Sequence, residues 1–280
     1  MIPKVIHYCW FSGEEMSPFA KRCIATWRKK MPDYRLRLWD SNSIQHLIDT
    51  VPFVRDAYNA KKWAFVTDYV RLYALYTEGG VYMDTDVKVV RYFDEFLSYS
   101  FFSSHEVHPG FFESEPVKLD ENNVPHNKEE FIYYWAIQAA IMGAEKGHPY
   151  LKDCIEYYNR KSFYDSNGDI DKNELVIGKH ITRIAVQKYG YRYVDEDMII
   201  GNNMLIKKSD VFVGNMIYYH RGHEYAIHLC NGSWNDGSGS WIWNMRNRHP
   251  IIYNTFIAPI QKVINKISNG CRKIFSIHIK

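Results

Sequence analysis

Two aspartates separated by one residue have the clearest potential for chemistry in this 280-residue chain. Asp84 and Asp86 follow a short apolar run, Val81 to Met83, which has the composition of a buried strand. Side chains two residues apart on an extended strand point the same way, so both carboxylates can address one divalent cation. Magnesium or manganese held by few protein ligands keeps open positions for diphosphate oxygens. Acidic pairs of this spacing also occur in solvated turns, so the neighbouring residues are needed to distinguish a metal site from such a turn.

The segment before the aspartates is predicted to be an amphipathic helix that ends at a glycine pair. Its apolar and aromatic residues recur at steps of three and four, the period of one buried helical stripe. The stripe consists of Phe65, Tyr69, Leu72, Tyr73 and Tyr76. Gly79 and Gly80 then end the helix, because glycine adopts the left-handed conformation at little steric cost. This order of helix, glycine pair and strand places both aspartates at the carboxyl end of the strand.

A second polar pair lies on the predicted helix. Asp68 and Arg71 are three residues apart and therefore share a helix face. One interpretation is a surface ion pair, which contributes about 0 to 1 kcal/mol. The other follows from the apolar and aromatic neighbours of the pair, since burying it requires a polar partner such as a sugar hydroxyl.

Together these residues resemble the sugar-binding DxD region of glycosyltransferase family 32. The resemblance rests on the ordered set Asp68, Arg71, Gly79, Gly80, Tyr82, Asp84 and Asp86. The family includes bacterial capsule and lipopolysaccharide transferases and the yeast outer-chain mannosyltransferase, and its core is similar to the glucosylating domain of large clostridial toxins. The resemblance implies an α/β fold of GT-A type, which is a Rossmann-like, nucleotide-sugar-binding mixed sheet flanked by helices. It also implies a nucleoside diphosphate sugar donor, a Mn²⁺ or Mg²⁺ cofactor and retention of the anomeric configuration.

The same resemblance implies roles for the catalytic set. Asp84 and Asp86 would hold the metal, while Asp68 and Arg71 would hold the donor sugar. Tyr82 would help to shape the donor pocket, to which Asp84 also contributes.

A late histidine followed by Ser-Trp lies next to the donor diphosphate in family members. By resemblance His228 would be a metal ligand or a phosphate contact, and Ser233 and Trp234 would close over the donor. An ordinary core histidine is the other interpretation of His228. Further polar residues nearby are open alternatives to it, namely His220, His223, Asn231 and Asn235.

The first 50 residues predict a sheet with crossover helices. Residues 3–11 have the composition of a strand, Ser17 can cap a helix through about Lys30, and residues 35–39 alternate like a second strand. Ser41 could cap a short helix that follows. Ligands of open α/β sheets gather at the carboxyl ends of strands, which puts Trp10 and Phe11 near a nucleotide. In the toxin relatives the corresponding tryptophan stacks on the donor base, so Trp10 is either that base platform or a core residue.

After the aspartates the sequence is less informative. We expect a strand over residues 96–102, a long polar loop over 103–128, a helix over 129–146 and another helix from Tyr150. Residues 165–171 resemble a calcium loop only superficially. The sixth and twelfth positions of an EF-hand would be Ile170 and Val176, so we expect a solvated turn there.

Composition and cysteine usage indicate a globular chain in a reducing compartment. The content is 46% hydrophobic and 16% aromatic. The cysteines are five and widely spaced without a CxxC pair, which favours free thiols. We expect no signal peptide, since Met1-Ile2-Pro3-Lys4 leads directly into an apolar run, and no apolar stretch reaches the roughly 18 residues of a membrane span. These features predict a bacterial cytoplasmic protein, soluble or peripheral on the inner face of the cytoplasmic membrane.

The positive net charge of +3 comes from the C-terminal end. Residues 237–280 carry seven basic and no acidic residues, so the first 236 residues carry −4. A basic body suited to nucleic acid is therefore excluded. Residues 251–280 have the pattern of a basic amphipathic tail, which would lie on an anionic membrane or dock on the domain. We expect a glycosyltransferase domain over 1–250 and this tail over 251–280.

The predicted function is metal-dependent, retaining transfer of a hexose, with a UDP-sugar as the favoured donor. The acceptor would be a surface polysaccharide or a lipid-linked oligosaccharide. A retaining mechanism allows the departing phosphate to take the acceptor proton, so no separate base is required. Two alternatives remain. A sugar nucleotidyltransferase usually carries an N-terminal Gly-rich phosphate loop with a basic residue, which this sequence lacks; a noncatalytic module would merely hold a glycan or an anionic lipid.

Overall fold

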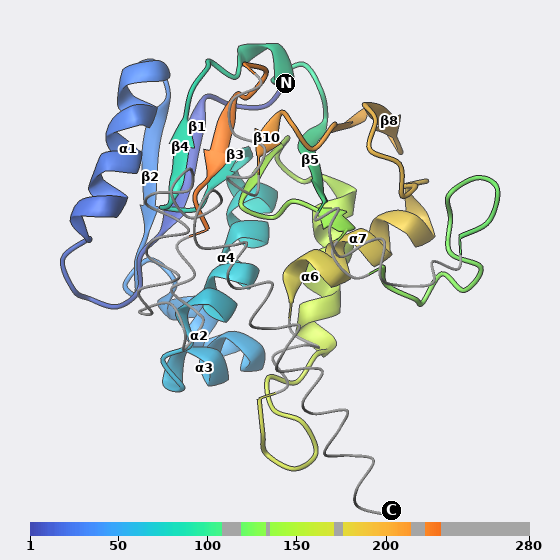
Figure 1. Ribbon diagram of the computed structural model, residues 1–280. Helices are drawn as coiled ribbons and strands as arrows, with labels where there is room; N and C mark the ends of the chain where they lie inside the picture. Colours follow the sequence, from blue (N-terminus) through green and yellow to red (C-terminus); the bar gives the residue numbers. More distant parts are fainter. Residues whose placement is uncertain (108–118, 133–134, 171–175, 214–221, 231–280) are drawn as a thin grey trace, which may run out of the picture. The chain divides into compact units, whose positions relative to one another are not determined.

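The computed structural model describes residues 1–107, 119–132, 135–170, 176–213 and 222–230, which lie in one compact unit, Met1–Cys230 (Figure 1). The predicted boundary at residue 250 and the tail over 251–280 lie outside the described residues. No helix in the described ranges is both long and apolar enough to cross a membrane. The four described cysteines are free thiols, as expected.

The unit is built on one mixed sheet with the strand order β2-β1-β3-β7-β5-β9-β8, and β6 pairs with β5 beside this path. The strands are β1 (Val5–Cys9), β2 (Arg35–Trp39), β3 (Gly80–Met83), β5 (Phe101–Val107), β6 (Trp135–Ile137), β7 (Ile141–Ala144), β8 (Met198–Ile200) and β9 (Met204–Lys207). Strand β1 runs parallel to both β2 and β3, whereas β3 and β5 are antiparallel to β7. Helices flank this sheet, which confirms the predicted α/β class with a mixed sheet.

A small second sheet has the order β10-β11-β4 and connects distant parts of the chain. Its strands are β4 (Val87–Val89), β10 (Phe212–Val213) and β11 (Ala226–His228). Because β4 follows the Asp84-Thr85-Asp86 motif directly, its antiparallel pairing with β11 sets His228 opposite Val87. This pairing brings the late histidine beside the aspartate motif.

Buried side chains alternate between the two faces of the main sheet, as the period of two requires. On one face Ile6, Tyr8, Val81 and Met83 pack with Ile24 and Trp27 of α1 (Pro18–Lys30). On the other face Cys9 and Tyr82 belong to the cluster formed with α3 (Pro52–Asn59), α4 (Trp63–Glu78), α6 (Pro149–Arg160) and α7 (Ile177–Lys188). Figure 1 shows α1 and α4 at different sides of the strands. The sheet is thus covered on both faces, and its carboxyl edge is left for a site.

Several predicted elements are confirmed. Ser17 caps α1 by accepting a hydrogen bond from the Ala20 amide at 3.1 Å. Helix α4 ends at the glycine pair and β3 follows it. The buried surface of α4 is wider than the predicted apolar stripe, because Val66, Val70 and Ala74 are buried as well. Residues 165–170 form an exposed turn in which the Asp165 carboxylate accepts from the amides of residues 167 and 169, as expected for a solvated turn.

The helix expected over 129–146 is wrong, because β6 and β7 occupy this segment. Both strands are buried on both faces, so they lack the alternation that marks a half-exposed strand. The strand expected over 96–102 begins later, at Phe101, after a short 3₁₀ helix, η1 (Asp94–Phe96). Residues 103–107 therefore belong to β5 and not to the expected loop.

The helix cap expected at Ser41 is also wrong. Helix α2 (Gln45–Thr50) starts after Ile44 and has no side-chain cap. The Ser41 hydroxyl instead donates to the Phe11 carbonyl at 3.1 Å, and Asp40 exchanges hydrogen bonds with Ser43. This contact ties the carboxyl ends of β1 and β2 together.

Candidate active site

The junction between α4 and β3 requires glycine. Gly79 and Gly80 have φ angles of +69° and +120°, in the region that L side chains rarely adopt. A Cβ atom at Gly80 would lie 2.7 Å from the Val5 carbonyl oxygen and 3.0 Å from His7 Nε2. The helix therefore turns into the strand directly against β1, which fixes where β3 ends and where Asp84 begins.

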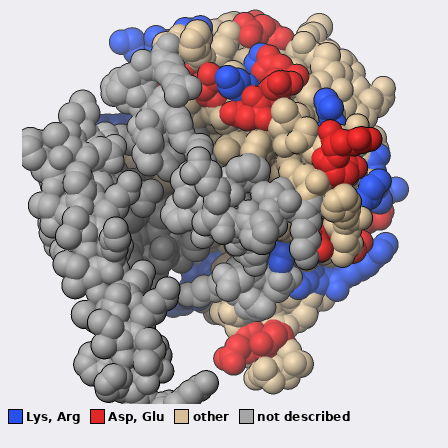
Figure 2. All heavy atoms as spheres, turned by 45° about the vertical axis from the view of Figure 1, so that its right-hand side comes forward, with Lys and Arg blue, Asp and Glu red and all other residues tan. Residues whose placement is uncertain are grey.

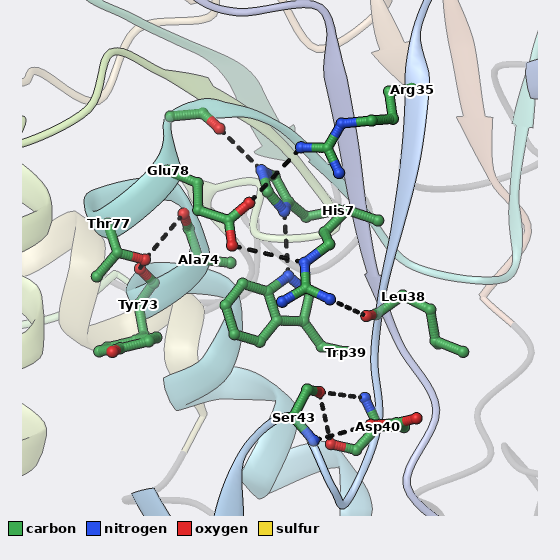
Figure 3. A network of polar contacts seen from close by, with 12 residues as sticks. His7, Arg35, Leu38, Trp39, Asp40, Ser43, Tyr73, Ala74, Thr77 and Glu78 are labelled. Carbon is green, nitrogen blue, oxygen red and sulfur yellow. Dashed lines mark hydrogen bonds and ion pairs between the residues drawn. The ribbon is translucent and has the colours of Figure 1, made fainter. Parts of the chain in front are cut away.

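A buried histidine holds this junction in place (Figure 3). His7 Nε2 donates to the Gly79 carbonyl at 2.8 Å, and His7 Nδ1 accepts from the Trp39 indole at 3.0 Å. These two contacts define the neutral Nε2–H tautomer, and burial lowers the pKa of His7 further from physiological pH. Arg35 and Arg37 of β2 approach the Glu78 carboxylate at 3.9 and 3.5 Å. Strands β1 and β2 are thereby tied to the end of α4.

Arg71 links the two acidic parts of the candidate site. Its guanidinium lies 3.0 Å from Asp68 Oδ1 and 3.5 Å from Asp84 Oδ2. Asp68 and Arg71 are both nearly inaccessible, with side chains 9% and 7% exposed, so the surface ion pair is excluded and the buried pair is observed. Burial raises the pKa of Asp68 to about 7 although Arg71 opposes the rise, and the nearby Asp84 adds to it.

Tyr82 orients the first aspartate of the motif. Its hydroxyl donates to Asp84 Oδ1 at 2.5 Å, and the Arg71 guanidinium lies 4.9 Å from the centre of its ring. Burial raises the pKa of Tyr82 well above its ordinary value, so the hydroxyl keeps its proton. One carboxylate oxygen of Asp84 is thus held by Tyr82 and the other by Arg71.

The turn between β6 and β7 forms a wall of the site that sequence reasoning missed. The Ala139 carbonyl accepts from Arg71 Nη1 at 2.8 Å, and the Ala140 carbonyl accepts from the Asp84 amide at 2.9 Å. Both contacts use backbone oxygens, so the side chains carry no signal of them. This turn fixes Arg71 and Asp84 relative to one another.

Asp84, Asp86 and His228 form a group of potential metal ligands. One ligand atom from each residue lies within 4.8 Å of the others, and His228 Nε2 is 3.3 Å from Asp86 Oδ1. Two ligands of one hard cation lie at most about 4 to 5 Å apart, and neighbouring ligands about 3 Å apart. The Leu229 amide also donates to the Asp86 carbonyl at 3.0 Å, which holds the two segments together. Two carboxylates and an imidazole are suitable ligands for Mn²⁺. They also suit Mg²⁺, although Mg²⁺ prefers oxygen over nitrogen ligands more strongly.

Cys230 contacts the other side of the His228 ring. Its sulfur lies 3.6 Å from His228 Nδ1, which leaves Nε2 turned toward Asp86. Burial lowers the pKa of His228, but Cys230 and Asp86 outweigh burial, so the pKa is raised well above its ordinary value. Cys230 itself has a φ of +47°, a conformation uncommon outside glycine. The imidazole is therefore held in one orientation at the edge of the aspartate motif.

The two aromatic residues at the end of β1 lie in different surroundings. The Trp10 indole donates to the Glu14 carbonyl at 2.7 Å within its own loop. Phe11 is buried and lines a cavity of about 480 Å³ together with Tyr58 and Trp63, whose rings are 5.3 Å apart. Sequence reasoning missed Tyr58, near the end of α3, and Trp63, the first residue of α4. Ser233 and Trp234 lie outside the described residues.

Residues 19–102 match the family model described as "Glycosyltransferase sugar-binding region containing DXD motif". The predicted resemblance is confirmed by this match, which covers α1 except its first residue, all of α4 and the Asp84-Thr85-Asp86 motif. The chain therefore contains the DXD sugar-binding region of a glycosyltransferase.

Two curated proteins and a solved structure are similar to the chain. Inositol phosphoceramide mannosyltransferase 3 of Schizosaccharomyces pombe is 29% identical over 167 residues, 58% of this chain and 38% of that protein. Initiation-specific alpha-1,6-mannosyltransferase of Candida albicans is 29% identical over 165 residues, 55% of this chain and 41% of that protein. The chain thus spans about two fifths of the length of these relatives. The solved PaToxG glycosyltransferase is 18% identical, with 67% of this chain and 70% of that chain covered and a TM-score of 0.45.

Proposed function

We propose that the chain is a metal-dependent, retaining glycosyltransferase of GT-A type that takes a hexose from a nucleoside diphosphate sugar. One observation carries the proposal: Asp84, Asp86 and His228 converge although His228 lies 142 residues beyond Asp86 in the sequence. Asp84 of this group lies beside the buried Arg71, and Asp68, Arg71, Asp84 and Asp86 all fall within residues 19–102, which match the glycosyltransferase model. Diphosphate and sugar sites are thus expected next to each other.

The metal would be held by Asp84, Asp86 and His228. A bound Mn²⁺ or Mg²⁺ would act as a Lewis acid that neutralises the negative charge of the departing diphosphate. Tyr82 and Arg71 contribute by keeping the Asp84 carboxylate in one orientation before the donor arrives. Preorganisation of this kind avoids a cost of ordering the ligands during binding.

Asp68 and Arg71 would bind hydroxyl groups of the donor sugar. Arg71 is already hydrogen-bonded to the Ala139 carbonyl, and it fixes one oxygen of Asp68. The second carboxylate oxygen of Asp68 can accept a hydrogen bond from a sugar hydroxyl. This bond would satisfy a buried polar atom that otherwise lowers the stability of the fold. This arrangement explains why such a pair is buried at the sheet edge.

The cavity formed by Phe11, Tyr58 and Trp63 supports a place for the donor base. It opens at the carboxyl end of β1, where ligands of open α/β sheets gather. Its aromatic walls suit a planar base, and Ser12, Ser41 and Asn59 add polar groups. Trp10, in the same loop, remains the second candidate for stacking, and Ser233 and Trp234 remain candidates for closing over the donor.

For the donor and the acceptor we propose classes of compounds and not single compounds. We favour a UDP-sugar as the donor. Both curated relatives are named mannosyltransferases, so GDP-mannose belongs in the same donor panel. One relative is named for inositol phosphoceramide, which supports a lipid-linked acceptor beside a surface polysaccharide. We place the protein in the cytoplasm, with the domain over 1–250 and the tail over 251–280 attached to the inner face of the membrane.

Release of nucleoside diphosphate from a panel of UDP- and GDP-sugars, with and without manganese, tests the proposal. We expect one donor to be turned over only with a divalent metal, and Asp86→Asn to reduce this turnover at least about a hundredfold. Asp49→Asn is the matched control, because Asp49 is exposed on α2 and its carboxylate contacts Gln45 of the same helix. Turnover that is equal in Asp86→Asn and in the control would show that the motif does not serve the reaction.

A further inference from the structure

Helix α1 carries an unusual concentration of positive charge. It contains Lys21, Arg22, Arg28, Lys29 and Lys30 and no acidic residue, so its net charge is +5. The whole chain carries +3 and residues 231–280 carry +6, so residues 1–230 carry −3. Without α1 this part of the chain would carry −8. Helix α1 is therefore net basic, while the remainder of residues 1–230 is net acidic.

All five basic side chains of α1 are exposed. The opposite side of the helix, formed by Ala20, Cys23, Ile24 and Trp27, is buried against the strands. Four of the cations, Lys21, Arg22, Arg28 and Lys29, fall on one outward arc at 100° per residue, and Lys21 lies two turns, or about 10 Å, from Arg28. These four residues form what we call the α1 basic face.

Several basic residues elsewhere in the unit have carboxylate partners, but most of this face does not. On α6 and α7, Lys152 and Arg160 lie within 4 Å of Glu156, and Lys188 contacts Asp153. Figure 2 shows red and blue side chains next to each other on the face turned to the viewer. On α1 only Lys21 has a carboxylate partner, Glu15, among the described residues. Three of the four cations of the α1 basic face are thus uncompensated locally.

The helix is also a wall of the candidate active site. The Trp27 indole donates to the Val87 carbonyl at 2.7 Å, and the Val89 amide donates to the Thr26 hydroxyl at 2.9 Å. Both contacts join α1 to β4, which follows Asp86 directly. A surface that binds the outer side of α1 would therefore lie one helix diameter, about 10 Å, from the aspartate motif.

We propose that the α1 basic face docks on a membrane surface that contains anionic phospholipid. An anionic membrane attracts clustered lysine and arginine, and it touches one side of the protein while the acidic remainder faces away. A nucleic acid fits less well, since the acidic remainder repels a flexible polyanion. Because the apolar side of α1 is buried in the fold, docking is electrostatic without insertion and weakens as salt is added. This surface is distinct from residues 251–280.

Sedimentation of the full chain with vesicles tests the proposal. The vesicles contain either phosphatidylcholine alone or about 30% phosphatidylserine, and no donor sugar is needed. The test variant carries Lys21→Gln, Arg22→Gln, Arg28→Gln and Lys29→Gln. The control variant removes the same charge from the other side of the unit through Lys152→Gln, Arg160→Gln, Lys161→Gln and Lys188→Gln. Circular dichroism checks that both variants fold. Two double variants, Lys21→Gln with Arg22→Gln and Arg28→Gln with Lys29→Gln, are measured separately.

We expect the wild type and the control to bind the anionic vesicles at low salt and to ignore the neutral ones. The test variant should bind on the order of a hundredfold more weakly, and each double variant should fall between. Equal loss in test and control variants would overturn the assignment to α1, as would full binding by the test variant or no binding by the wild type. Stronger α1-dependent binding to a single-stranded oligonucleotide at equal phosphate concentration would favour a nucleic acid and also overturn it. None of these outcomes depends on the proposed transferase activity.

Discussion

Replacing Asp68 by asparagine is expected to stabilise the folded protein above pH 7 while it removes transferase activity. The Asp68 side chain is 9% exposed, and burial raises the pKa of its carboxyl from 3.8 to about 7. The folded state therefore binds this proton more tightly than the unfolded chain does. Its contribution to stability is fully present below about pH 4 and is lost as the pH rises through about 7.

The size of the effect follows from the same pKa. Each pH unit between the two pKa values corresponds to about 1.4 kcal/mol, which gives about 4 kcal/mol lost above pH 7 as an upper bound. Asparagine keeps the shape of the side chain. It also keeps an oxygen that can accept a hydrogen bond from the Arg71 guanidinium, which lies 3.0 Å from Asp68 Oδ1 in the wild type. We therefore expect Asp68→Asn to raise the free energy of unfolding by about 2 to 4 kcal/mol at pH 8 and to change it little at pH 4.

Urea denaturation at both pH values measures this difference, with Asp49→Asn as the control on an exposed carboxylate. The same protein samples are then assayed for donor turnover, which should fall in Asp68→Asn because the carboxylate proposed to bind the donor sugar is lost. A variant that is less stable than the wild type at pH 8 would refute the argument that the buried carboxylate costs stability. A stabilised variant with full turnover would show that Asp68 has no part in the reaction.

Three further predictions concern the metal, the junction and the tail. His228→Ala should raise the manganese concentration for half-maximal turnover if His228 is a ligand, and an unchanged metal and donor dependence would make it a packing residue. Gly80→Ala should lower the free energy of unfolding by about 2 to 4 kcal/mol in thermal or urea melts, since its Cβ would meet Val5 and His7, whereas Gly13→Ala, in open space, should cost about 1 kcal/mol or less. Truncation after Tyr253 should weaken sedimentation with anionic vesicles, and equal sedimentation of both forms would exclude the tail as an attachment site.

The centre of the fold was predictable because several local signals agree there. The helical period before Gly79, the glycine pair and the short apolar strand all point to the same helix, turn and strand. Steric limits at Gly80 leave no room for a side chain at this junction. The Asp68 and Arg71 pair was recognisable for a similar reason, since charged residues on an otherwise apolar helix need a buried partner.

Other parts depend on contacts that the sequence does not encode locally. The strands β6 and β7 are buried on both faces, so their residues have no alternation and mimic a helix. Their turn holds Arg71 and Asp84 through the backbone carbonyls of Ala139 and Ala140, for which no side chain is required. The approach of His228 to Asp86 depends on the pairing of β4 with β11, and only the resemblance to a family suggested it. The cavity around Trp63 likewise combines three segments that are separate in the sequence.

The position of a bound metal tests the central claim most directly. Anomalous scattering from manganese, in crystals grown with a nucleoside diphosphate, locates the ion without any assumption about the reaction. We expect one strong peak about 2.0 to 2.5 Å from carboxylate oxygens of Asp84 and Asp86 and from Nε2 of His228. No peak at this group, or a manganese ion held by other residues while the group stays empty, would contradict the account.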